Sequence, residues 1–124
     1  MLRVTAGNYE EAQSCPFRSV LNNVGDKWSF LIFAVLEDQP RRFNEIKRLI
    51  GDISQRVLTK NLRELEREGY VSRRVYPTKP PKVEYALTEL GRSLLGPVTQ
   101  FMNWAIDAYP RIEQARREFD DAQK

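Results

Sequence analysis

The sequence predicts a mainly α-helical fold with one small β-hairpin, and three observations lead to this prediction. Apolar residues recur at helical spacing through most of the 124 residues. Two short runs rich in β-branched and aromatic residues, 70–76 and 83–87, flank a segment with three prolines. An apolar content of 41% and a charged content of 30% are typical of a soluble globular domain of this length. The chain is therefore expected to fold as short helices around one core, with a hairpin attached.

Two helices are expected before residue 37. Pro16 suits the first turn of a helix, where its missing N–H needs no partner, so the first helix covers about residues 16–23. Gly25 interrupts, and Asp26 can cap a second helix over residues 27–36. The apolar side of the first helix consists of Phe17, Val20, Leu21 and Val24. The second helix has a broad stripe that is predicted to face the core, formed by Trp28, Leu31, Ile32, Val35 and Leu36.

The next two helices match the helix-turn-helix pattern. A turn at residues 37–40 and a short edge strand at Arg41 and Arg42 precede a third helix over residues 43–50. Its inward residues are predicted to be Phe43, Ile46, Leu49 and Ile50. A tight turn at residues 51–52 leads to the fourth helix, which Ser54 can cap and Gly69 can end. Two short helices joined by a turn with glycine are typical of a helix-turn-helix.

The fourth helix has one apolar face and one cationic face. Leu58, Leu62 and Leu65 recur at i, i+4 and i+7, which predicts that one face is buried, and Ile53 can pack on Leu58 at the helix start. The opposite face carries Gln55, Arg56, Thr59, Lys60 and Arg63, together with the capping Ser54. Long cationic and amide side chains of this kind can read base edges in the major groove of DNA. Taken alone, the same face also fits an ordinary solvated surface.

The hairpin is expected to be stiff and basic at its tip. Three prolines within residues 77–82 remove backbone donors and fix φ, so this segment is a loop between two strands. Four basic residues lie on or near the tip: Arg73, Arg74, Lys79 and Lys82. A basic hairpin can be merely solvated, but directly after a helix-turn-helix it is better interpreted as a wing that contacts phosphates.

A long final helix is expected after the hairpin. Thr88 can cap it, and Leu90, Leu94, Val98, Phe101, Ala105 and Ala108 form a continuous stripe. Pro97 is expected to kink this helix and Pro110 to end it, leaving a short charged helix over residues 111–119 and a frayed tail. The predicted organisation is a flexible arm (1–14), a DNA-binding domain with dimerisation helices (15–110), and a short C-terminal helix with its tail (111–124).

More apolar surface is present near the two ends than one small core needs. The residues concerned are Phe17, Leu21, Phe101, Trp104, Ile106 and Tyr109. Because Trp104 and Ile106 lie off the main stripe of the final helix, we expect a homodimer built from that helix and the first one. The alternative is that these side chains cover the domain's own core.

Charge and composition narrow the function. The net charge is only +3, but residues 41–92 hold 13 Lys or Arg against 7 Asp or Glu, which favours a polyanionic partner at this part of the surface. The chain has no His and a single Cys, so His-based catalysis, His or thiolate metal sites and an internal disulfide are excluded. No apolar run is long enough to span a membrane and no secretory signal is present. These features predict a cytoplasmic protein that is not an enzyme and needs no metal or cofactor.

A set of short motifs occurs in a fixed order along the chain: Cys15-Pro16, residues 25–28, 42–46, 53–59 and 62–71, Arg73-Arg74, residues 80–88, Gly91 and Trp104. This ordered set resembles the HxlR-type winged helix-turn-helix transcriptional regulators, within the MarR-like superfamily. The resemblance covers about residues 15–104 in register. It implies a homodimeric regulator of bacterial or archaeal type that binds double-stranded DNA at a near-palindromic site. It also implies that the fourth helix enters the major groove and that the hairpin reaches the flanking backbone or the minor groove. Arg41 and Arg42 would then hold phosphate beside the third helix.

Two further points follow from the resemblance. Several members of this family sense oxidants or electrophiles through a Cys at the position of Cys15. Arg18 and a helix start lie close to it here, and such neighbours make a thiol more reactive. The alternative is a packed, unreactive Cys15. A small-molecule inducer is a further variant, with a site near Trp28 and Trp104. The rival function is a winged helix used only for protein association, which should carry apolar residues on the outer face of the fourth helix.

Overall fold

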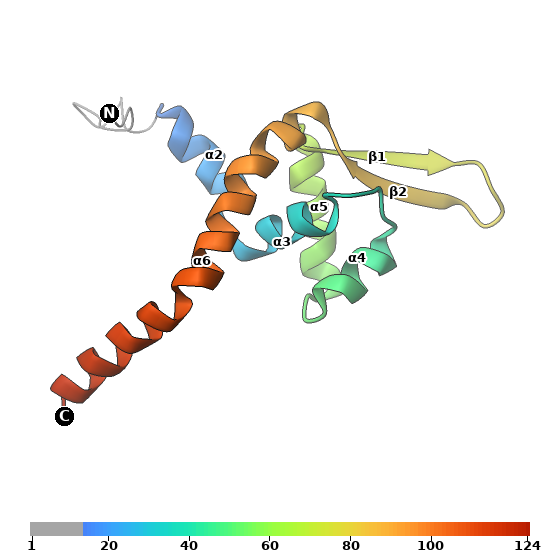
Figure 1. The fold of residues 1–124 in the computed structure, drawn as a ribbon. Helices are drawn as coiled ribbons and strands as arrows, with labels where there is room; N and C mark the ends of the chain where they lie inside the picture. The colour runs from blue at the N-terminus through green and yellow to red at the C-terminus, as the bar shows by residue number, and fades with distance from the viewer. Residues whose placement is uncertain (1–13) are drawn as a thin grey trace.

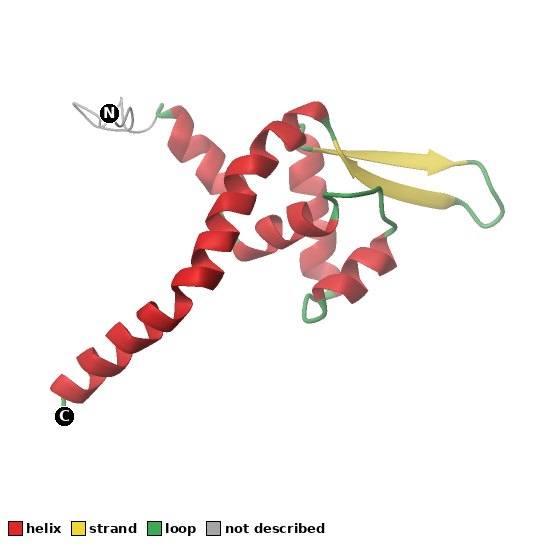
Figure 2. Cartoon of the chain, viewed as in Figure 1, coloured by secondary structure: helices red, strands yellow, loops and turns green. Residues whose placement is uncertain are grey.

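The computed structural model describes residues 14–124 and confirms a mainly α fold with one antiparallel hairpin. The predicted flexible arm, apart from Ser14, lies outside the described residues. The elements are α2 (Pro16–Val24), α3 (Lys27–Val35), α4 (Phe43–Ile50), α5 (Gln55–Arg67), β1 (Val71–Tyr76), β2 (Lys82–Leu87) and α6 (Glu89–Ala122). Figures 1 and 2 show the hairpin projecting to one side of the helices and the end of α6 projecting to the other.

The predicted helix starts are observed where a side chain can satisfy an orphan backbone N–H. Asp26 Oδ1 accepts from the Ser29 N–H at 2.7 Å, Ser54 Oγ from the Val57 N–H at 3.1 Å, and Thr88 Oγ1 from the Gly91 N–H at 3.1 Å. Gly69 follows α5 with φ of 88°, in the left-handed region that favours glycine. These local signals therefore set the starts of α3 and α6 and both ends of α5 much as the sequence predicts.

The core is formed where α3, α4, α5 and the start of α6 meet. Its largest fully buried apolar side chains are Phe33, Ile32, Leu36, Ile46, Ile53, Leu58, Leu62 and Leu65. The three leucines of α5 are inward as predicted. In α3 the most buried apolar side chains are Ile32, Phe33 and Leu36, whereas Trp28, Leu31 and Val35 are only partly buried. The inward position predicted for Leu49 is wrong, because this side chain is 50% exposed.

Helix α6 corrects the prediction made from its prolines. Pro97 and Pro110 both lie inside one helix that continues to Ala122, so the predicted break at Pro110 and the separate helix over residues 111–119 are wrong. A proline removes one intrahelical hydrogen bond and frees the carbonyl four residues earlier. Both prolines are exposed, so water can satisfy those carbonyls. The helix therefore tolerates both prolines without ending.

The two strands pair in a single register. Val71 lies opposite Leu87, and the pairing continues to Tyr76 opposite Lys82. Beyond the hairpin, Arg41 bridges to Tyr85, with N–H···O distances of 2.9 and 2.8 Å in the two directions. The short edge strand predicted at Arg41 and Arg42 is thus confirmed at Arg41, and it anchors the base of the hairpin to the segment before α4.

Gly91→Ala is expected to destabilise the fold, whereas Gly96→Ala in the same helix is not. A Cβ at Gly91 would overlap the Tyr70 carbonyl oxygen, which already accepts the Thr88 N–H at 3.0 Å. The loss should be about 3 kcal/mol, at the upper end for overpacking. A Cβ at the exposed Gly96 meets no atom within 4 Å, so alanine there should stabilise by roughly 0.5–1 kcal/mol through helix propensity. Urea denaturation of both variants tests this, and equal midpoints would contradict it.

Candidate nucleic-acid interface

The outer face of α5 is formed by side chains that the buried leucines turn toward solvent. Ser54, Gln55, Arg56, Thr59, Lys60 and Arg63 are all exposed. Within residues 14–124, neither Arg56, Lys60 nor Arg63 has an acidic partner within salt-bridge distance. The Thr59 hydroxyl donates to the Gln55 carbonyl at 2.8 Å, so toward a ligand it offers its methyl group and its oxygen as acceptor. The face therefore presents three uncommitted cations beside the polar side chains of Ser54, Gln55 and Thr59.

A groove of about 450 Å³ separates α5 from the hairpin. It brings together three of the residues singled out in the sequence: Thr59 and Arg63 from α5, and Arg73 from β1. The remaining lining comes from Phe43, Glu66 and Tyr85. Two guanidinium groups against one carboxylate leave the groove positive, so the cationic surface continues from α5 onto the hairpin.

One face of the hairpin arranges cations around an aromatic ring. The Arg74 guanidinium carbon lies 4.9 Å and the Lys82 Nζ 5.2 Å from the centre of the Tyr76 ring, and Lys82 Nζ lies 4.0 Å from Glu84 Oε1. A side-chain hydrogen bond with Glu84 raises the pKa of Tyr76. Partial burial and the Glu84 charge raise this pKa further, and the Arg74 charge lowers it by less, so the phenol stays neutral at physiological pH. The exposed Lys79 lies in the loop at the tip. Tyr76 was not predicted from the sequence, because its neighbours depend on the cross-strand register of the hairpin.

Arg41 and Arg42, predicted as a pair, differ in the structure. The Arg41 guanidinium donates to the Val35 carbonyl at 2.8 Å and to Asp38 Oδ1 at 3.1 Å, and the side chain is only 17% exposed. Its bonds connect the end of α3 to the segment before α4. Arg42 is exposed, and its backbone N–H donates to Glu45 Oε1 at 3.0 Å. Of the two, only Arg42 has a side chain free to contact a ligand.

Asn44 and Arg48 on α4 are two further polar candidates that the sequence analysis did not single out. Both are exposed, and both line a second groove, beside Arg42 and Lys82. Their i, i+4 spacing on the face opposite Ile46 and Ile50 is the signal that could have found them. They extend the cationic surface across α4.

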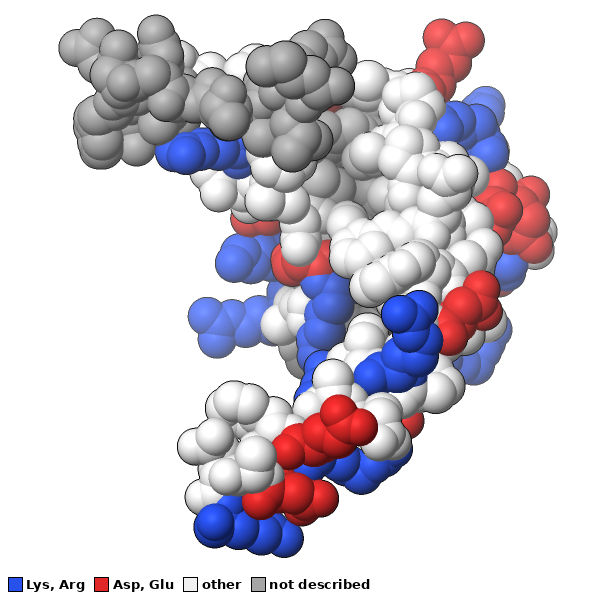
Figure 3. All heavy atoms as spheres, turned by 60° about the vertical axis from the view of Figure 1, so that its left-hand side comes forward, with Lys and Arg blue, Asp and Glu red and all other residues white. Residues whose placement is uncertain are grey.

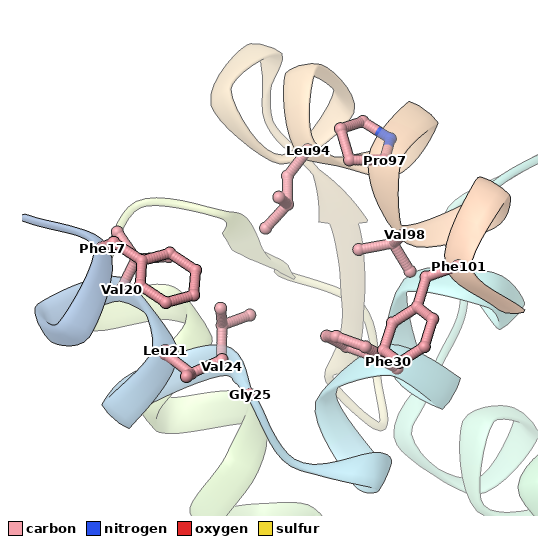
Figure 4. Close-up of a pocket in the computed structure, with 10 residues that line it drawn as sticks. All are labelled: Phe17, Val20, Leu21, Val24, Gly25, Phe30, Leu94, Pro97, Val98 and Phe101. Atoms are coloured by element: carbon pink, nitrogen blue, oxygen red, sulfur yellow. The ribbon is translucent and has the colours of Figure 1, made fainter. Parts of the chain in front are cut away.

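An apolar surface lies on the opposite side of the molecule from the hairpin. Phe17 and Leu21 of α2 and Phe101, Trp104, Ile106 and Tyr109 of α6 are 47–70% exposed. Figure 3 shows uncharged surface over this part of the molecule. A groove of about 320 Å³ runs between the two helices, with α2 side chains on one wall and α6 side chains on the other (Figure 4). Phe30 and Phe101 meet edge-to-face in this groove, with ring centroids 5.7 Å apart.

Cys15 lies apart from the cationic surface. It is half-buried and occupies the N-cap position of α2, directly before Pro16. Within the described part of the chain, no group of three or more His, Cys, Asp or Glu side chains is placed to hold a metal ion. None of the helices among residues 14–124 combines the length and apolar character that a membrane span requires.

A helix-turn-helix with an exposed cationic second helix, followed by a basic hairpin, defines a winged helix-turn-helix protein. The family model described as HxlR-like helix-turn-helix matches residues 23–113, and the chain belongs to this family of transcriptional regulators.

Relatives agree with this assignment. The HTH-type transcriptional regulator YdeP of Bacillus subtilis is 40% identical over 90% of this chain and 89% of its own length. The redox regulator HypR in its reduced form is 43% identical, covering 80% of this chain and 98% of HypR, with a TM-score of 0.75. The transcriptional regulator YtfH from Salmonella typhimurium is 36% identical, covering 90% of this chain and 99% of YtfH, with a TM-score of 0.79.

Proposed function

We propose that this regulator binds DNA sequence-specifically as a homodimer, with the outer face of each α5 in the major groove of one half of a near-palindromic site. The observation that carries the proposal is the set of exposed, uncommitted cations on α5. Arginine and lysine suit guanine edges, and glutamine suits adenine. The proposed base-reading residues are Gln55, Arg56, Thr59, Lys60 and Arg63, with Ser54 at the helix start.

The hairpin and α4 supply the proposed phosphate contacts. Arg73 lines the groove beside α5, and Arg74 and Lys82 stack on Tyr76, so their positions are restrained before DNA arrives. Lys79 reaches out from the tip, and Arg42 lies beside α4. We leave Arg41 out of the contact set because its guanidinium is already engaged. Phosphate contacts of this kind supply most of the affinity and make binding sensitive to salt.

A second copy of the chain is the proposed cover for the apolar surface on α2 and α6. Phe17, Leu21 and Phe101 line one groove, and Phe101 also contacts Trp104 with ring centroids 6.3 Å apart. Ile106 and Tyr109 line a separate apolar hollow on α6, and exposed apolar surface of this kind marks interaction sites. A twofold dimer would place the two α5 helices about one turn of DNA apart, which matches a near-palindromic site. Use of the fold only for protein association is disfavoured, because none of the exposed large apolar side chains among residues 14–124 lies on α5.

We further propose that oxidation of Cys15 regulates DNA binding. Support comes from its place at the start of α2, one of the proposed dimer helices, and from the similarity to the redox regulator HypR. With one Cys per chain, the product is an intersubunit disulfide, a mixed disulfide or a direct adduct. Cys15→Ser is expected to bind DNA like wild type. After treatment with diamide or peroxide, its DNA affinity should change at least about tenfold less than that of wild type. Unchanged wild-type affinity after oxidation would remove this part of the proposal.

Selection of bound sites from random duplexes tests the main proposal. Wild-type protein is expected to enrich sequences with twofold symmetry and half-sites about 10 base pairs apart, centre to centre. Enrichment without symmetry would reject the dimeric arrangement, and no enrichment would reject sequence-specific binding.

A further inference from the structure

We propose that the groove between α4 and the free edge of β2 is a second binding site for a DNA backbone phosphate, separate from the groove beside α5. The inference rests on the proposed DNA-binding function and adds Asn44, Arg48 and the Val83 backbone N–H to it. The groove has a volume of about 600 Å³ and is lined by Arg42, Phe43, Asn44, Glu45, Arg48, Pro81, Lys82 and Val83.

The backbone of β2 supplies a donor at this groove. In an antiparallel strand, residues two apart direct their N–H and C=O groups to the same edge. Tyr85 exchanges both of its backbone hydrogen bonds with Arg41, so that edge faces away from β1. Val83 lies two residues nearer the tip, where residues 14–124 provide no third strand, so its N–H points to the open edge beside α4. Backbone N–H groups at such positions are common phosphate donors.

Three cations from two elements surround this donor. Arg42 and Arg48 come from the start and body of α4, and Lys82 comes from β2. Within residues 14–124, Arg48 has no acidic partner within salt-bridge distance. Lys82 Nζ lies 4.0 Å from Glu84 Oε1, a long and partly exposed pair, so the ammonium can exchange this partner for a phosphate. The single carboxylate lining the groove, Glu45, accepts the Arg42 backbone N–H. The groove is therefore a positive site with both side-chain and backbone donors.

A DNA backbone phosphate is the occupant that these groups favour. A phosphodiester carries one negative charge and offers acceptor oxygens to a guanidinium and a backbone N–H at the same time. Phe43 lines both this groove and the groove beside α5, so the two adjoin across one side chain. DNA held by α5 can therefore extend its backbone across α4 without leaving the cationic surface.

Arg48→Gln tests the site, with Arg117→Gln as the matched control. Both residues are exposed, and Arg117 lies near the far end of α6. Arg48→Gln is expected to weaken binding by about tenfold, the size of one charge-assisted hydrogen bond. It should also lower the slope of log Kd against log salt by about 0.9 while the preferred sequence stays the same. Arg117→Gln should match wild type. Fluorescence anisotropy over a salt series measures all three proteins.

Duplexes with single phosphates replaced by neutral methylphosphonates locate the contact. A methylphosphonate at one position should weaken DNA binding by wild type but not by Arg48→Gln. The Val83 amide resonance should shift when the normal duplex is added, but not when the duplex with that substitution is added. Arg48→Gln behaving like Arg117→Gln, or a Val83 resonance that responds equally to both duplexes, overturns the inference. If wild type itself binds no duplex, the proposed function fails instead. Loss of base preference in Arg48→Gln would assign Arg48 to base reading and also reject a phosphate site.

Discussion

Ile106→Asp is expected to turn the proposed dimer into a monomer and to lower affinity for the proposed near-palindromic site by about 100-fold or more, the gain usually provided by two linked binding units. Ile106 is 70% exposed, the highest value among the exposed large apolar side chains of residues 14–124. Its replacement therefore removes little from the chain's own core. In a twofold interface each substitution occurs twice, so two carboxylates would be buried without partners. Sedimentation equilibrium and anisotropy on full and half sites measure the two effects.

Gln39→Glu is the matched control for charge. It adds the same single negative charge in an exposed turn between α3 and α4, far along the chain from α6. This variant should remain dimeric and keep its affinity for the full site. Ile106→Asp should also keep wild-type affinity for an isolated half-site, because α5 is untouched. A dimer of undiminished strength in Ile106→Asp would show that the partner copy packs elsewhere.

The parts of the fold that the sequence predicted well are those set by neighbouring residues. The caps at Asp26, Ser54 and Thr88 each join a side chain to a backbone N–H three residues later, so the short sequence pattern contains both partners. The inward leucines of α5 follow from periodicity within one helix. The exposure of the cations then follows, because side chains opposite the buried face of an amphipathic helix lie in solvent. The α5 surface was predictable for this reason.

The features that were missed depend on where the chain turns back on itself or on local solvent exposure. Arg41 looks like a free surface cation, but the return of the chain after α3 brings its guanidinium to the Val35 carbonyl. The stacking of Lys82 on Tyr76 requires the register of the hairpin. The continuity of α6 through Pro110 depends on the exposure of that turn to water, which spacing does not reveal. Each is a property of the assembled fold.

Arg56→Ala is expected to cost roughly 1–3 kcal/mol at the cognate site, about 5- to 150-fold in Kd, and to relax one base position. Arg56 is exposed in the first turn of α5 and, within residues 14–124, has no ion pair to lose, so stability should be unchanged. A long guanidinium at this end of the helix can make two hydrogen bonds to guanine, and alanine can make none. Site selection and anisotropy with cognate and substituted duplexes give the measurement. Equal binding of Arg56→Ala and wild type to the cognate site would reject base reading by Arg56.

Lys79→Ala separates base reading from phosphate binding. Lys79 lies in the exposed loop at the hairpin tip, where a flexible ammonium acts as a point charge and carries no base preference. The variant should weaken all sequences by a similar factor and lower the salt slope by about 0.9, whereas Arg56→Ala changes the ranking of sequences. If both variants lowered the affinity for every DNA sequence by the same factor, α5 would be contacting the DNA backbone and not the bases. Opposite patterns from two cations on one surface can arise only if α5 enters the groove while the hairpin stays on the backbone.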